Sequence, residues 1–275
     1  MAIEELLFDR DDFTKKLGFQ LFAEAFGTFI LAFMAQASVI TGLNPEQARP
    51  DQMISTSLAI CSALIIAIYL CGPTSGSHIN PAMTVCKLLT GSTNLVKVLL
   101  YSVAQFIGAL CATGTLCALC PSDWILGQGH LDGTGHPNWL LELNPKSTFT
   151  QGLFVEILAT MLLGLVFLLV TDPIAGKQFA GVAPIIVGLV VSGLFLSISP
   201  LTKCCMNPAI ALAQAMIMSH YDISLLVYTL GPFLGAVAAA LVYSTLLVHG
   251  IRQKDEYEDL RLVLNYRKAD SKYDG

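Results

Sequence analysis

The sequence predicts an all-α membrane protein in which six transmembrane helices and two re-entrant half-helices form an inverted repeat. Three observations support this fold class. Apolar residues make up 54% of the 275 residues and charged residues only 13%, whereas a soluble domain carries roughly 25% charged residues. Several apolar runs are long enough to cross a bilayer. The second half of the chain also repeats features of the first half in the same order.

Two apolar runs without any charged residue are the clearest predicted spans, Met53–Cys71 with 19 residues and Phe179–Leu201 with 23. A helix needs roughly 20 apolar residues to cross the hydrocarbon core. Because a lone strand would leave its backbone groups unsatisfied in lipid, these runs are expected to be helices. Four further runs are as apolar, with at most one or two interruptions, and they cover residues 17–40, 95–119, 150–171 and 223–248.

The six spans divide the chain into a short N-terminal segment, a membrane domain and a C-terminal tail. We place these parts at residues 1–16, 17–248 and 249–275, with one repeat at about 17–120 and the other at about 150–248. An even number of spans puts both termini on one side, and 12 of the 15 Lys and Arg residues fall on that side. The positive-inside rule therefore predicts that both termini are cytoplasmic. A net charge of −5 gives no basic excess for binding nucleic acid.

The internal repeat is the strongest signal in the sequence. Glu24 in the first span has a counterpart in Glu156 of the fourth span, within the shared pattern Leu-Phe-x-Glu-x-x-x-Thr-x-x-Leu. Asn-Pro-Ala also occurs twice, and the glycine of a shared Phe-x-Gly-Ala lies 28 residues beyond each Asn. Because an odd number of spans separates the copies, the two halves must cross the membrane in opposite senses.

Each Asn-Pro-Ala copy opens an apolar piece too short to span, Asn80 to about Thr90 and Asn207 to about Met218. Such short segments are candidates for re-entrant elements. Asn is a favoured N-cap residue, and Pro at the first helical position gives up an amide hydrogen that would be unpaired anyway. The inverted repeat then brings two half-helix N-termini together near the midplane. Their positive ends would repel cations, and the two asparagines could donate hydrogen bonds to a passing water.

From about Gly18 to Val248 the chain resembles the aquaporin, or major intrinsic protein, family. Ser75–Ala82 and Met206–Ala209 are similar to the two signature loops of that family. The resemblance implies a central constriction at both Asn-Pro-Ala motifs, and it implies that the two glutamates hold the re-entrant loops through backbone amides. These predicted residues are Asn80, Pro81, Ala82, Asn207, Pro208, Ala209, Glu24 and Glu156. The resemblance also implies a homotetramer with one pore per subunit.

The predicted outer constriction, or selectivity filter, departs from the family pattern. Most family members have an arginine directly after the second Asn-Pro-Ala, and this chain has Ile210 there. Offsets from the motifs place the other filter positions at Ile60, Phe195 and Cys204. An apolar filter would slow water, favour less polar neutral solutes such as glycerol or peroxide, or close by dewetting. Lys203 could supply a displaced positive charge, or it could face water in the outer loop.

Other polar residues leave alternatives open. His78 would either line the cytoplasmic pore mouth as a pH-sensitive gate or act as a structural loop residue. Glu24 and Glu156 could carry protons in a transporter, although two repeat-related loop supports are the simpler reading. Cys117-x-x-Cys120 with His130 and His136 only loosely imitates a zinc spacing, so we expect no metal and no cofactor.

The sequence therefore predicts a passive channel for water or small neutral solutes in a lipid bilayer, and not an enzyme, because no catalytic set of residues is visible. An ion-coupled transporter would need carboxylates or an unwound carbonyl cage at the midplane, and only the two glutamates are candidates. A third possibility is a structural or junctional membrane protein with a closed or poorly conducting pore. The loop at residues 121–149 is expected to fold over the outer mouth.

Overall fold

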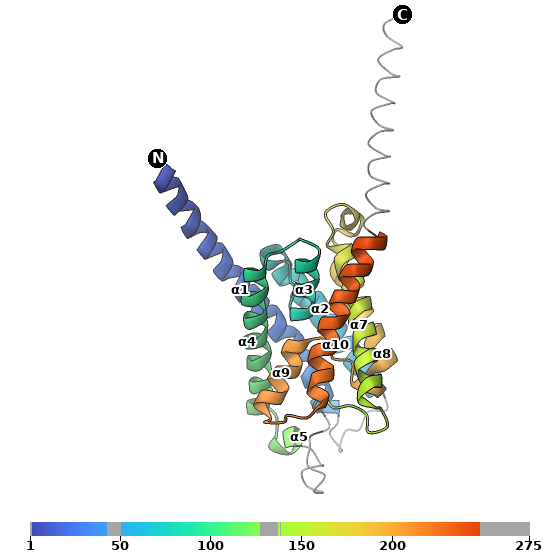
Figure 1. Ribbon diagram of the computed structural model, residues 1–275. Coiled ribbons are helices and arrows are strands. Elements are labelled where there is room, and N and C mark those ends of the chain that lie inside the picture. Colours follow the sequence, from blue (N-terminus) through green and yellow to red (C-terminus); the bar gives the residue numbers. More distant parts are fainter. Residues whose placement is uncertain (1, 43–50, 127–136, 138, 248–275) are drawn as a thin grey trace, which may run out of the picture.

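The computed structural model describes residues 2–42, 51–126, 137 and 139–247, and these residues form a bundle of helices (Figure 1). Within them, six helices are long and apolar enough to cross a membrane, as predicted. These helices are α1 (Ala2–Gly42), α2 (Gln52–Ser75), α4 (Leu95–Leu119), α7 (Phe149–Val170), α8 (Ala183–Thr202) and α10 (Ser224–Val242). His130, His136 and the predicted tail at residues 249–275 lie outside the described residues.

Two short helices confirm the predicted half-helices, α3 (Pro81–Leu89) and α9 (Pro208–Ile217). Asn80 caps α3 by accepting a 2.9 Å hydrogen bond from the amide of Ala82, and Asn207 caps α9 by accepting one of 3.1 Å from the amide of Ala209. Each helix has its proline in the first turn, where the missing amide hydrogen costs nothing. The Asn-Pro-Ala motif is therefore a helix start signal in both halves.

Figure 1 shows α3 and α9 in opposite halves of the bundle. We call the face with η2 (Ala175–Phe179) and the end of α10 the terminal face, and the face with α5 (Ser122–Leu126) the loop face. α3 lies toward the terminal face and α9 toward the loop face. The two half-helices thus enter from opposite sides, as an inverted repeat requires.

Three span boundaries differ from the prediction for local reasons. The first span is part of a continuous helix that starts at Ala2, so the predicted segment 1–16 leads into it without a break. α8 starts at Ala183 and not at Phe179, because residues 175–179 form the 3₁₀ helix η2, and Pro184 lies in the first turn of α8. α10 gives way at Tyr243 to a π-helical turn, η3 (Tyr243–Leu247).

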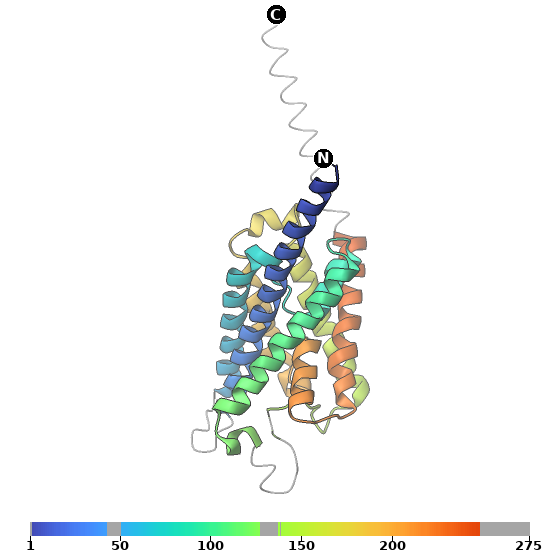
Figure 2. The same ribbon diagram turned by 90° about the vertical axis from the view of Figure 1, so that its left-hand side faces the viewer.

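The two halves pack by the same close helix crossing. α1 lies beside α4 (Figure 2), and α7 lies beside α10. A β-carbon on Gly108 of α4 would overlap the carbonyl oxygen of Ala25, and one on Gly235 of α10 would lie 2.6 Å from that of Ile157. The repeated glycines therefore permit these crossings.

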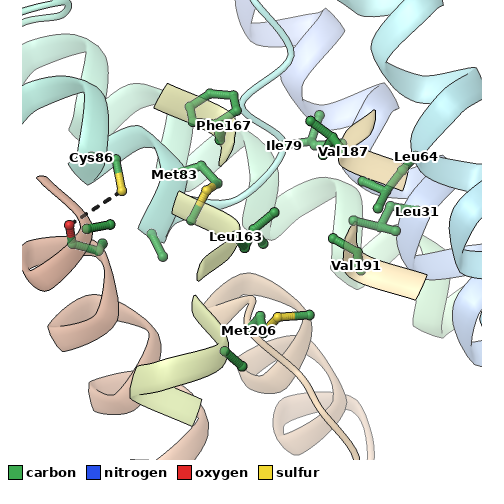
Figure 3. Packing of buried hydrophobic residues seen from close by; sticks show 14 of the residues in the cluster. Leu31, Leu64, Ile79, Met83, Cys86, Leu163, Phe167, Val187, Val191 and Met206 are labelled. Atoms are coloured by element: carbon green, nitrogen blue, oxygen red, sulfur yellow. Dashed lines mark hydrogen bonds between the residues drawn. The ribbon is translucent and has the colours of Figure 1, made fainter. Parts of the chain in front are cut away.

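Apolar side chains from both halves converge on the region between the half-helices. Figure 3 shows Met83 of α3, Leu163 of α7 and Met206 of the segment before α9 in this region, with Val187 and Val191 of α8 facing Leu31 and Leu64. Cys86 lies at the edge of this cluster and donates to the carbonyl of Ala236 at 3.5 Å. This core fixes the positions of the loops that precede the half-helices.

Candidate pore

Two loops of equal length lead into the half-helices, the first loop (residues 75–80) and the second loop (residues 202–207). Their backbones correspond position by position. Left-handed φ angles occur at Gly76, Ser77 and Ile79 in the first loop, and the corresponding residues of the second loop are Lys203, Cys204 and Met206 with φ of 58°, 52° and 52°. Because side chains disfavour this region, the repeated strain indicates that outside contacts hold both loops in place.

Glu24 provides the contacts for the first loop from a fully buried position in α1. Its Oε1 accepts hydrogen bonds from the Ser75 hydroxyl at 2.6 Å and the His78 amide at 2.9 Å. Its Oε2 accepts from the Ile79 amide at 2.7 Å and from Gln105 Nε2 of α4 at 2.7 Å. With both oxygens used in this way, the geometry favours the loop-support role over proton transport.

Glu156 holds the second loop in the same way from α7. Its Oε1 accepts from the Thr202 hydroxyl at 2.7 Å and the Cys205 amide at 3.1 Å, and its Oε2 accepts from the Met206 amide at 2.8 Å. Ser75 and Thr202 occupy the same place in the repeat, five residues before each Asn. Gln105 has no such counterpart, because the corresponding position in α10 is Pro232, which carries no donor.

The two capping asparagines tie the loops to each other. Asn80 Nδ2 donates to the carbonyl of Met206 at 2.8 Å, and Asn207 Nδ2 donates to the carbonyl of Ile79 at 3.0 Å. An amide nitrogen has two hydrogens, so each asparagine retains one after this bond. The half-helix N-termini therefore meet, and their positive ends and remaining donors lie at one level of the molecule.

A cavity of about 270 Å³ passes this level. Asn80 and Asn207 both line it, whereas the prolines and alanines of the two motifs lie buried in the first turns of α3 and α9. On the terminal side the lining includes His78 and Phe167, and on the loop side it includes Trp139 and Leu141. Trp139 and Leu141 belong to the loop at residues 121–149, whose residues 127–136 and 138 lie outside the described residues, so its predicted folding over the outer mouth stays a prediction.

The four predicted filter residues, Ile60, Phe195, Cys204 and Ile210, all line this cavity. They come from α2, α8, the second loop and α9, so only the fold brings them together. All four side chains are apolar or weakly polar. Their action as a selectivity filter stays a prediction.

His78 and Lys203 also line the cavity, on opposite sides of the asparagines. His78 Nδ1 lies 3.2 Å from the Thr84 hydroxyl, and its ring makes edge contacts with Tyr101 and Phe167. These contacts suit a structural loop residue that also faces the cavity. Lys203 Nζ donates to the carbonyl of Leu140 on the loop face.

Sequence reasoning missed Gln105 and the loop residues Trp139 and Leu141. A glutamine within an apolar span was a visible signal, because a buried polar side chain needs a partner. Trp139 and Leu141 gave no such signal, since their place at the mouth depends on contacts distant in sequence. Leu141, for example, is fixed through its amide, which donates to Gln214 Oε1 of α9 at 3.1 Å. Within the described residues, no group of three or more His, Cys, Asp or Glu side chains could hold a metal ion.

Six spanning helices, two half-helices that meet at their N-termini and a cavity past their asparagines define an integral membrane channel protein. The sequence model of the major intrinsic protein family matches residues 13–243. The chain belongs to this family of transport channels. It is accordingly a passive channel for water and small solutes, and the alternative of a structural protein with a closed pore is not favoured.

Similar proteins cover most of the chain. Aquaporin-5 of Sus scrofa is 32% identical over 227 residues, which is 82% of this chain and 80% of the relative. Nodulin-26 of Glycine max is 31% identical over 231 residues, 82% of this chain and 76% of the relative. The X-ray structure of the aquaglyceroporin from Plasmodium falciparum has a TM-score of 0.73 at 22% identity and covers 86% of this chain and 98% of that one. The last similarity supports the fold.

Proposed function

We propose that solutes cross this protein in single file past Asn80 and Asn207, and that an apolar filter at Ile60, Phe195, Cys204 and Ile210 favours small neutral solutes alongside water. The observation that carries this proposal is the pair of asparagines on the cavity wall, each with one amide hydrogen left after its bond to the other loop. A water or hydroxyl oxygen at this level can accept both hydrogens, so it has little capacity left to relay a proton.

The filter proposal rests on Ile210. An arginine at this position would offer hydrogen-bond donors and a cation-repelling charge to the outer half of the pore. Isoleucine offers neither. A polar solute that loses its hydration water beside Ile210 therefore gains no hydrogen bond from this residue to offset the cost. A solute with carbon–hydrogen surface, such as glycerol, loses less than water does on entering an apolar ring. We therefore place glycerol-like solutes among the permeants, together with peroxide as another small neutral solute.

Swelling and shrinking of liposomes that contain the purified protein tests this function. Osmotic gradients of sucrose, glycerol and urea, without any ion gradient, should give water flux well above that of empty vesicles, together with glycerol entry. Ile210→Arg should lower glycerol entry several-fold relative to water, and Ile210→Val should leave the ratio near that of the wild type. Equal glycerol-to-water ratios in all three proteins would reject the filter assignment, and an absence of flux would reject the channel.

We also propose a homotetramer with both termini in the cytoplasm. The tetramer is the arrangement that the family resemblance implies. The orientation follows from the 12 Lys and Arg residues on the side of the termini. Cross-linking in native membranes would test the first, and protease access to a tag at either end would test the second.

A further inference from the structure

The second loop places a lysine where the repeat places a glycine. Gly76 lies four residues before Asn80 with φ of 89°, and Lys203 lies four residues before Asn207 with φ of 58°. Glycine adopts this left-handed backbone at no steric cost, while a side chain makes it unfavourable. The backbone therefore gives no reason for a lysine at this position. Lys203 is the left-handed C-cap residue of α8, and the contacts of its side chain distinguish it from the glycine.

The Lys203 side chain extends along the loop-face mouth of the cavity. It lines the cavity and is half-buried, and its Nζ donates to the carbonyl of Leu140. Leu140 is itself buried, and its neighbours Trp139 and Leu141 line the same mouth. The ammonium group thus lies where a permeant from the loop face first leaves bulk water.

The opposite charge that acts on Lys203 is Glu142, which does not line the cavity. The nearby filter positions Phe195, Cys204 and Ile210 are uncharged. Burial lowers the pKa of Lys203, while the charge of Glu142 opposes that shift and favours the protonated form. Glu142 is also engaged by His220, with 3.0 Å between Oε1 and Nε2. A charge beside an apolar, low-dielectric mouth acts more strongly on an approaching ion than it would in water.

We infer that the charge of Lys203 excludes cations from the loop-face mouth of the cavity. An arginine at position 210 would repel cations, and Lys203 does this in place of the uncharged Ile210. This inference rests on the proposed pore. It adds a second barrier to the positive half-helix ends at Asn80 and Asn207, placed earlier on the path of a cation. Cation exclusion and solute selection then depend on different residues, because the four filter residues can stay apolar while the charge of Lys203 lies beside them at the mouth.

The test compares methylammonium, a small cation, with urea, a small neutral solute, by influx into proteoliposomes. Lys203→Gly suits the left-handed backbone and removes the charge, and Lys203→Met removes the charge but keeps a long side chain. Both variants should raise the ratio of methylammonium to urea influx about tenfold. Lys203→Arg should behave like the wild type. Lys146→Met, at an exposed position, is the matched control and should change nothing.

The outcomes separate this inference from the proposed function. An unchanged methylammonium-to-urea ratio in both neutral variants, with normal water flux, would overturn the inference and leave the channel intact. A parallel rise of both solutes would also overturn it, because that result means that the variants only loosen the mouth. An absence of water and urea flux in the wild-type protein would reject the pore itself, and the inference with it.

Discussion

The first and second loops share one backbone and one scheme of support but differ in the side chains that they present. In each loop a buried glutamate accepts from a hydroxyl and from the amides of the two residues before the Asn. The first loop adds Gln105 as a further donor to its glutamate. The second loop instead has Lys203 in the place of Gly76.

This difference shows which parts of the pore the inverted repeat constrains. The carboxylate and the capping asparagines are duplicated because an irregular backbone inside a membrane must find partners for its polar groups within the protein. The side chain at the position of Gly76 and Lys203 takes no part in this backbone support. A lysine can therefore occupy the position in the second loop. The predictions below test how far the two loops are equivalent, from the largest expected effect to the smallest.

Glu24→Ala and Glu156→Ala should each lower the stability of the fold strongly. They leave four and three donors, respectively, without their acceptor, and most of these donors are buried. At about 1–3 kcal/mol for each unsatisfied group, the loss is on the order of 5 kcal/mol or more, and it should be larger for Glu24. Thermal unfolding in detergent measures it. Glu142→Ala, at a partly exposed glutamate, is the control with a small effect, and a Glu24→Ala protein as stable as this control would contradict the support scheme.

The second prediction concerns the two helix crossings. Gly108→Ala should cost more than Gly235→Ala, because its β-carbon would overlap a backbone oxygen, that of Ala25, while the one at Gly235 would lie 2.6 Å from the Ile157 oxygen. We expect losses of about 1–3 kcal/mol for such overpacking. Gly114→Ala is the matched control in α4, since a β-carbon there meets no atom within 4 Å. If Gly108→Ala were as harmless as Gly114→Ala, α1 and α4 would not cross at this glycine.

Much of the similarity between the two halves of the protein could be predicted from the sequence. The lengths of the apolar runs predicted the spans, and the repeated Glu and Asn-Pro-Ala predicted the half-helices with their caps, because these signals are local or periodic. The partners of Glu24 could be predicted only in part. The loop amides followed from the family resemblance, while Gln105 donates from a separate span and needs the three-dimensional fold. The left-handed backbone at Lys203 had no local signal in the sequence, because lysine does not favour this conformation. Only an alignment of the two loops pairs Lys203 with Gly76.

The capping asparagines should respond alike. Asn80→Ala and Asn207→Ala each remove a helix cap and the bond to the opposite loop, at 2.8 Å and 3.0 Å. We expect each to cost about 2 kcal/mol, and Asn94→Ala about 1 kcal/mol, because Asn94 caps α4 from an exposed position and makes only the local bond to the Lys97 amide. Unfolding midpoints of the three variants test this ranking. Losses no greater than that of Asn94→Ala would mean that the reciprocal bonds contribute nothing.

The smallest expected effect belongs to Gln105, the residue that distinguishes the two supports. Gln105→Leu removes a 2.7 Å bond to Glu24 and a 3.1 Å bond to the Thr84 hydroxyl. It also removes a buried Oε1 that has no hydrogen-bond partner among the described residues, and this offsets part of the loss. We expect a net cost of about 1 kcal/mol.

A double-mutant cycle makes this prediction decisive. In the Gln105→Leu protein Glu24 keeps only the hydroxyl and the two loop amides, the same set of donors that Glu156 has. The additional loss caused by Glu24→Gln in that background should then equal the loss caused by Glu156→Gln in the wild type, while in the wild type Glu24→Gln should cost more. Equal losses for both glutamates in the wild-type protein would show that Gln105 adds nothing, and that the two loops are supported alike despite their different neighbours.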